Sequence, residues 1–281
     1  MNVKRETLAA DVVRWVVTGI LLLGGIAMVF PLFWLLSTSL RPASELLASP
    51  PALLPQQWTV DNYGVLFSEA PMFQYLWNSI VFATVSTVFI LVTSTIAGYV
   101  FAKFQFPGNN LLFMLVVATA IVPFEIYMVP LFTQMNALRL VNQPLGLFLP
   151  FLVLSYGIFF MRQNTMTSVP DELLDAARID GMGEFGIMFR MIPRFLAPAM
   201  SALAILAFIQ AWTAFIWPLL ILNDEKLFPM ELGLAQFANR LSVDFGVTSA
   251  GAVFAMLPTL AAFLILRRRI VEGITLTGLK G

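Results

Sequence analysis

The sequence predicts an all-α integral membrane protein. Residues 1–281 are expected to form a single transmembrane domain of six helices, with a cytoplasmic loop of two short helices between the fourth and the fifth. Of the 281 residues, 59% are hydrophobic and only 11% are charged, which lies outside the range of soluble domains. Six apolar runs reach or approach the ~20 residues that a helix needs to cross a bilayer core. One long polar segment, residues 168–194, interrupts them.

The predicted spans are residues 13–36, 79–101, 111–132, 145–161, 196–222 and 247–266, the fourth being the shortest. The first is interpreted as retained rather than cleaved, because no small-x-small site follows it and Pro31 and Trp34 continue the apolar run. In the second, Gly98 among small residues indicates helix packing. Pro123 and Pro130 weaken the third helix and can leave backbone carbonyls free to line a cavity.

Lysine and arginine are distributed unequally between the two sides of these spans. Twelve of the 16 cationic residues fall on one side, and the other four are Arg41, Arg139, Lys226 and Arg240. The positive-inside rule makes the first side cytoplasmic. Both termini and the polar segment are therefore predicted to lie inside, and the Arg267–Arg269 cluster is expected to anchor the sixth span.

The polar segment carries the signals of a helix–glycine–helix unit. Pro170 suits a first helical turn, Asp171 and Glu172 suit its positive end, and Gly181 is a left-handed stop. Four residues follow the start at helical spacing: Leu173, Ala176, Ala177 and Asp180. A second helix is predicted over residues 183–192, with an apolar face made of Phe185, Met188, Phe189 and Ile192. Such a folded polar unit in a membrane protein indicates either a docking element for a soluble partner or a surface hairpin.

The same segment resembles the coupling loop of ATP-binding-cassette importer permeases. Residues 169–181 read Val-Pro-Asp-Glu-Leu-Leu-Asp-Ala-Ala-Arg-Ile-Asp-Gly, and the family signature centres on Glu-Ala-Ala with a glycine four residues later. Asp175 stands where the family has glutamate, and Pro193 falls one residue early with isoleucine before it. The resemblance assigns ATPase coupling to Glu172, Asp175, Ala176, Ala177, Asp180 and Gly181.

Further stretches resemble one branch of these permeases, the sugar importers of the maltose-transporter second-subunit type. In family order they are Pro31 to Trp34 with Ser39 to Pro42, Asn62-Tyr63, Asn78-Ser79, Ala97 to Tyr99, Ala102 to Gly108, Pro130 with Asn142, Ala211 to Leu219, and Gly273 to Gly281. This resemblance covers nearly the whole chain, and its strength lies in the shared order of the pieces.

The resemblance implies a set of partners in a bacterial or archaeal plasma membrane. A second permease subunit would complete a heterodimeric pore, and two cytoplasmic ATP-binding-cassette subunits would bind ATP and Mg. An extracytoplasmic sugar-binding protein would deliver solute to the loops at 38–77 and 223–246. In the maltose-type family the sugar site lies mostly on the other permease subunit.

Several absences narrow the chemistry of the chain. It contains no histidine and no cysteine, so an imidazole base, a thiolate nucleophile and a Cys/His metal site are all excluded. No G-x-x-x-x-G-K-[ST] loop occurs, so the sequence predicts neither an enzyme nor a cofactor site. The net charge of zero gives no indication of nucleic-acid binding.

Polar side chains inside the predicted spans are candidates for the translocation path, because burying them in lipid costs a few kcal/mol. Glu125 lies between the two prolines of the third span, and Gln210, Trp212 and Thr213 lie in the fifth. Neutral hydrogen-bonding groups beside an aromatic face suit a sugar. The alternatives are that Glu125 reaches water at the outer interface and that Gln210 makes a structural bond between helices.

Three other functions remain open on the sequence. A secondary transporter driven through Glu125 would need no ATPase, although no internal repeat of the kind that such transporters often carry is found. A membrane scaffold would use the polar segment only to recruit a soluble protein. An importer of the same class could carry a polyol or glycerol phosphate instead of a sugar.

Overall fold

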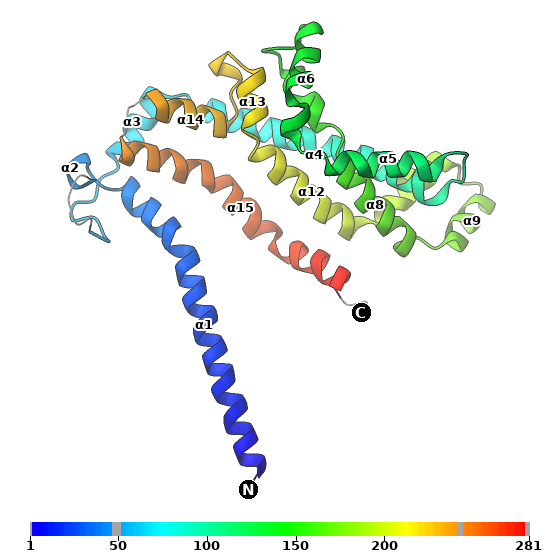
Figure 1. The fold of residues 1–281 in the computed structure, drawn as a ribbon, viewed down its shortest axis with the longest axis horizontal. Coiled ribbons are helices and arrows are strands. Elements are labelled where there is room, and N and C mark those ends of the chain that lie inside the picture. Colours follow the sequence, from blue (N-terminus) through cyan, green and yellow to red (C-terminus); the bar gives the residue numbers. More distant parts are fainter. Residues whose placement is uncertain (1, 47–51, 241–243, 279–281) are drawn as a thin grey trace. The chain divides into compact units, whose positions relative to one another are not determined.

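The computed structural model describes residues 2–46, 52–240 and 244–278, and throughout these ranges the regular secondary structure is helical (Figure 1). The predicted all-α class is therefore confirmed. The chain divides into two compact units, Met1–Pro71 with Gln236–Met256 and Met72–Ala235 with Leu257–Gly281. Helices α14 (Met230–Arg240) and α15 (Phe245–Gly278) contribute to both.

The first unit also holds α1 (Asn2–Ser39), α2 (Ala43–Leu46) and α3 (Asp61–Glu69). The second holds α4 (Met72–Lys103), α5 (Asn109–Ile121), α6 (Phe124–Ala137), α7 (Pro144–Phe148), η1 (Leu149–Phe151), α8 (Ser155–Ser168), α9 (Asp171–Ile179), α10 (Glu184–Gly186), η2 (Ile187–Met191), α11 (Ile192–Phe195), α12 (Ala197–Trp212), α13 (Ile216–Ile221) and η3 (Glu225–Leu227).

Two unbroken helical stretches are long and apolar enough to cross a bilayer, Val13–Ser39 of α1 and Met72–Lys103 of α4. Three bent helix pairs meet the same criteria, with bends of 102° between α5 and α6, 41° between Pro144–Phe151 and α8, and 82° between Glu184–Phe195 and α12. By length and composition, the described residues thus contain two helices that could cross a membrane, or up to five if each bent pair is one span. The stretch Phe245–Ala261 is a shorter apolar helix.

The predicted third, fourth and fifth spans are not continuous helices. The third breaks at Val122 and Pro123, because the residue before a proline is pushed into extended backbone. The fourth breaks after η1, where Leu154 is extended. The fifth breaks after Thr213. Pro218 has no N–H to bond to the carbonyl four residues earlier, and its ring would clash with that carbonyl in a continuous helix.

The core of the second unit is built where α4, α8 and α12 pack side by side (Figure 1). A Cβ atom on Gly98 would lie 2.8 Å from both the Arg162 backbone nitrogen and the Met161 Cβ. A Cβ atom on Gly157 would lie 2.5 Å from the Ser94 hydroxyl oxygen. The interpretation of Gly98 as a packing residue is confirmed, and glycine is what allows α4 and α8 to approach so closely.

The first unit is organised by a buried arginine. The Arg41 guanidinium stacks on Trp34 at 5.0 Å and donates hydrogen bonds to the Ser37 hydroxyl (2.9 Å) and the Ala52 carbonyl (2.6 Å). The Asn62 side-chain amide donates to the carbonyls of Ser39 and Arg41 at 2.9 and 2.8 Å. Asn62 therefore ties α3 to the segment that follows α1.

Candidate functional site

The polar segment folds as a helical hairpin (residues 169–196) made of α9 and the run α10–η2–α11. Helix α9 begins directly after Pro170, with Asp171 and Glu172 in its first turn, as the sequence predicts. Its buried face consists of Leu174 and Ala177, which join the apolar core around α4, α8 and α12. Of the two alanines singled out in the sequence, Ala177 thus packs inward, whereas Ala176 is exposed.

Helix α9 ends in the left-handed turn that the sequence predicts at Gly181, whose φ is +86°. The Met182 amide donates to the Ala177 carbonyl at 2.9 Å, and the Gly181 amide donates to the Arg178 carbonyl at 3.0 Å. These two bonds form a Schellman motif, which satisfies the last carbonyls of the helix. Since glycine adopts this conformation without strain, the turn is specified by a single residue.

The second arm of the hairpin differs from its prediction. Phe185 and Phe189 are exposed, 77% and 55%, whereas Ile187 and Ile192 are fully buried. Residues 187–191 form a π-helix, whose wider turn brings positions five apart onto nearly the same face. The predicted apolar face of Phe185, Met188, Phe189 and Ile192 is therefore wrong for its two phenylalanines, because it assumed the α-helical period throughout.

Charged side chains connect the two arms of the hairpin. Arg178 donates from Nε to Glu184 and from Nη1 to Asp175, each at 2.8 Å, while the Tyr99 hydroxyl of α4 donates to the other Glu184 oxygen at 3.0 Å. The hydrogen bond from Arg178 is the main cause that lowers the pKa of Glu184 below its usual 4.5, and the bond from Tyr99 adds to it. The two carboxylates also raise the pKa of Arg178.

A pH prediction follows from the lowered pKa of Glu184. Because the pKa of Glu184 is lower in the folded state, its carboxylate contributes fully to the stability of the fold above pH 4.5. That contribution is lost only as the pH falls through the lowered pKa. We expect a spin label on Ile179→Cys to keep one mobility between pH about 8 and about 5.5. Ile179 is 85% exposed and the chain has no native cysteine, so labelling is specific. Loss of order within that pH range would contradict the Arg178–Glu184 link.

The outer surface of the hairpin mixes apolar and acidic groups. Its exposed large apolar side chains include Leu173, Ile179, Met182, Phe185 and Phe189. Glu172, Asp175 and Asp180 are exposed beside them. A surface of this composition fits a protein interface, which combines apolar anchors with polar groups at the rim.

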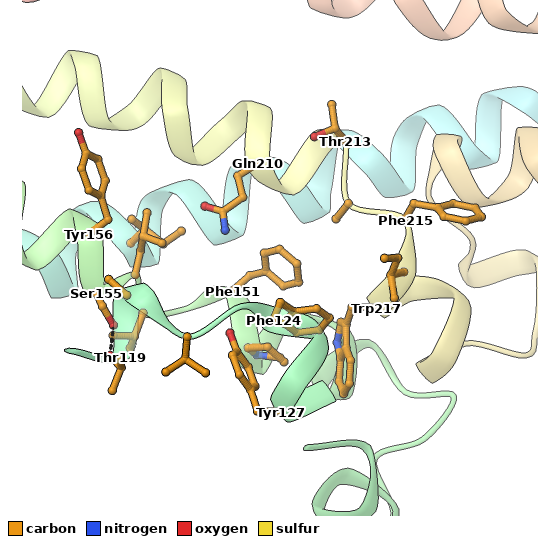
Figure 2. Close-up of a pocket in the computed structure, with 18 residues that line it drawn as sticks. Thr119, Phe124, Tyr127, Phe151, Ser155, Tyr156, Gln210, Thr213, Phe215 and Trp217 are labelled. Atoms are coloured by element: carbon orange, nitrogen blue, oxygen red, sulfur yellow. Dashed lines mark hydrogen bonds between the residues drawn. The ribbon is translucent and has the colours of Figure 1, made fainter. Parts of the chain in front are cut away.

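A cavity of about 620 Å³ opens where the three broken helices meet (Figure 2). Its 18 lining residues include Thr119, Phe124, Tyr127, Phe151, Ser155, Tyr156, Gln210, Thr213, Phe215 and Trp217. Figure 2 shows Gln210 pointing from α12 toward the rings of Phe124 and Phe151. None of the lining residues is Asp, Glu, Lys or Arg. The cavity therefore offers aromatic faces and neutral hydrogen-bonding groups.

The four residues predicted for the translocation path are placed differently. Gln210 and Thr213 line the cavity. Trp212 is buried, with 2% exposure, and stacks on Phe208 with ring centroids 5.7 Å apart. Glu125 lies exposed in the first turn of α6 and is not among the lining residues, although Phe124 beside it is.

The sequence reasoning missed the aromatic residues of the cavity. Trp217 donates from its ring nitrogen to the Gly146 carbonyl at 3.1 Å, and Phe124 meets its ring edge-on at 6.0 Å. Tyr127 in turn meets Phe124 edge-on at 5.2 Å. The signal available in the sequence was the proximity of these aromatic residues to Pro123 and Pro218, where the helices break.

An all-helical chain with membrane-spanning apolar helices, an uncharged cavity and an exposed hairpin has the features of a transport permease. The family comparison agrees: the model of the family described as "Binding-protein-dependent transport system inner membrane component" matches residues 94–274. The chain belongs to this family.

Relatives and a solved structure agree with this assignment. The chain is 37% identical to the arabinooligosaccharides transport system permease protein AraQ of Bacillus subtilis (strain 168) over 255 residues, 90% of each chain. It is 33% identical to the sulfoquinovosyl glycerol transport system permease protein SmoH of Agrobacterium fabrum, covering 95% of this chain and 93% of the relative. The fold matches a bacterial ABC transporter involved in the import of alginate, with a TM-score of 0.82, 20% identity, and 92% and 97% coverage.

Proposed function

We propose that this chain is one half of the pore of an ATP-driven importer that carries a carbohydrate. The observation that carries the proposal is the helical hairpin, a folded docking surface in a chain of the binding-protein-dependent transport family. Two ATP-binding-cassette subunits would bind ATP and Mg and dock on this hairpin. A second permease subunit would complete the pore, and an extracytoplasmic binding protein would deliver the solute.

Six crossings fit the described helices. Helices α1, α4 and α15 would each cross once, and the bent stretches α5–α6 and α7–α8 would supply two more crossings. The broken run α12–α13 would supply the sixth. The excess of lysine and arginine on the hairpin side supports a cytoplasmic position for the hairpin and both termini. The ATPases would then meet the hairpin on the side of the membrane where ATP is found.

Within the hairpin, the six residues assigned to coupling have distinct roles. Exposed Glu172, Asp175, Ala176 and Asp180 would face the ATPase cleft, and Gly181 would form the tight turn seated there. Ala177 is buried and would instead hold α9 against the permease. Closure of the ATPases on ATP would move the hairpin, and the attached spans would alternate the access of the pore.

A neutral carbohydrate fits the cavity better than a phosphate ester does. Sugar hydroxyls need hydrogen-bond partners and sugar C–H faces stack on aromatic rings, and Gln210, Thr213 and the exposed ring of Tyr127 offer both. A glycerol phosphate would be bound more strongly by a cationic side chain, because arginine and lysine form charge-assisted hydrogen bonds with phosphate. No lysine or arginine lines the cavity in the described part of this chain.

Reconstituted uptake tests the proposed function. Vesicles that contain this chain, its partner permease and the ATPases should accumulate an oligosaccharide only with ATP and the binding protein. The Glu125→Gln variant should retain uptake, because Glu125 does not line the cavity. If the isolated chain moved solute down an ion gradient and Glu125→Gln abolished it, the secondary-transporter alternative would replace the proposal. If deletion of the chain left uptake in cells unchanged, the scaffold alternative would.

Loss of the cavity amide should weaken transport. We expect Gln210→Leu to reduce uptake at low solute concentration roughly tenfold, since a lost hydrogen bond in a site costs about 1–1.5 kcal/mol. The control is Ser201→Ala on the same helix, because Ser201 bonds only to the Ala197 carbonyl and lies outside the cavity. Equal uptake by both variants would show that this cavity is not on the solute path.

A further inference from the structure

Helix α9 is held at both ends by one turn of α4. Tyr99 and Lys103 are four residues apart on α4, so they project from the same face of that helix. Lys103 contacts the start of α9, and Tyr99 contacts Glu184, which is bonded to Arg178 at the end of α9. We refer to these two contacts as the α4 clamp.

At the start of α9, Lys103 acts through its buried ammonium group. Its Nζ donates to the Val169 carbonyl at 2.6 Å and to the Asp171 carboxylate at 2.7 Å. The Lys103 side chain is only 8% exposed, whereas the Asp171 side chain is 76% exposed. In an ordinary surface ion pair both side chains are mobile in water. Here the Lys103 side chain is packed against the protein and only Asp171 remains in water, so the position of the ammonium group is fixed by α4.

At the end of α9, Tyr99 acts through Glu184. The Tyr99 ring is buried, with 1% exposure, and packs edge-on against Phe104 at 5.5 Å. Its hydroxyl donates to Glu184, and Glu184 accepts from Arg178 in the last turn of α9. Arg178 also holds Asp175. A continuous chain of hydrogen bonds therefore runs from α4 to an exposed carboxylate on the outer surface of the hairpin.

Helix α4 also reaches the cavity. Its residue Ile90 lines the cavity, and Gly98, next to Tyr99, lies at a close contact between α4 and α8. Besides the α4 clamp, α9 is connected to the spans by the packing of Leu174 and Ala177 and by the short loops on either side. A force on α9 thus has a direct polar route to a helix that lines the cavity.

We propose that Tyr99 and Lys103 are positioning residues that make α9 and α4 move as one body, so that α4 receives the motion of the ATPases and carries it to the cavity. This inference rests on the proposed function. Both side chains belong to α4 and lie outside the coupling signature of residues 169–181. They would transmit the motion of α9 to the spans. The clamp is a mechanical link, and it does not contribute to ATP hydrolysis or to docking itself.

The test separates docking, hydrolysis and transport in the assembled complex. Tyr99→Phe and Glu184→Gln should leave ATPase co-purification and ATP hydrolysis within about twofold, while solute moved per ATP hydrolysed falls several-fold. The double variant should be no worse than Glu184→Gln alone, because Glu184 accepts the Tyr99 bond as well as the Arg178 bond. Lys103→Met should act likewise and Lys103→Arg should restore coupling. Tyr63→Phe, which removes a hydroxyl bonded to Ser39 in the other unit, is the control.

The outcomes distinguish the two levels of the proposal. An unchanged ratio of solute to ATP in Tyr99→Phe, Glu184→Gln and Lys103→Met would overturn the α4 clamp while leaving the importer intact. Additive losses in the Tyr99–Glu184 double variant would overturn the shared link. Failure of any ATPase to associate with the wild-type complex would instead contradict the proposed function.

Discussion

Replacing Gly181 with tryptophan is expected to abolish coupled transport. Gly181 has a φ of +86°, a conformation that costs an L-residue about 1–2 kcal/mol. A Cβ atom there meets nothing within 4 Å, so the isolated chain should still fold. The indole would then project from the turn that the ATPase has to enclose. Co-purification of the ATPases in detergent, and uptake in vesicles, should both fall to background.

Two controls separate strain from steric exclusion. Asparagine tolerates the left-handed conformation, so Gly181→Asn should retain both docking and uptake. Gly183 lies in the same loop with a φ of −71° and open space around it, so Gly183→Ala should be nearly neutral. Full coupling in Gly181→Trp would mean that the ATPases dock elsewhere, and the hairpin would lose its assigned role.

The hairpin illustrates what the sequence could and could not specify. The end of α9 was predictable, because a left-handed glycine and its Schellman bonds depend on one residue and its immediate neighbours. The direction of Phe185 and Phe189 was not, because a π-turn changes the helical period. No local signal in residues 187–191 indicates such a turn.

The same distinction holds in the spans and the cavity. The break at Pro123 follows from the backbone restriction that a proline imposes on its own neighbour, and the sequence indicated a weakened helix there. The break after Thr213 is set by Pro218, which cannot bond to the carbonyl four residues before it. The predicted fifth span continued through this break. Gln210 was predicted as a lining residue and is one. Trp212 is instead buried against Phe208 outside the lining, and no local pattern in the sequence indicates that packing.

A side chain at Gly98 is expected to cause the largest loss of stability. In Gly98→Ala the new Cβ would lie 2.8 Å from the backbone nitrogen of Arg162, and a backbone atom cannot rotate away. Helix α8 would have to move, which strains the Arg162 bond to the Phe101 carbonyl (3.2 Å) and its stacking on Phe113 (4.1 Å). Overpacking of this kind costs typically about 1–3 kcal/mol. Thermal unfolding in detergent should show a clearly lowered midpoint.

The matched control is Gly24→Ala in α1, where a new Cβ meets nothing within 4 Å. Alanine favours a helix over glycine by about 1 kcal/mol, so this variant should be neutral or slightly more stable. The same substitution, glycine to alanine, should lower the stability at position 98 and leave it unchanged or raise it at position 24. This difference would identify the α4–α8 contact as the cause. If both variants unfolded at the wild-type temperature, the close approach of α4 and α8 at Gly98 would be wrong. The α4 clamp, which starts at the neighbouring Tyr99, would then lose the rigid helix pair through which it is proposed to act.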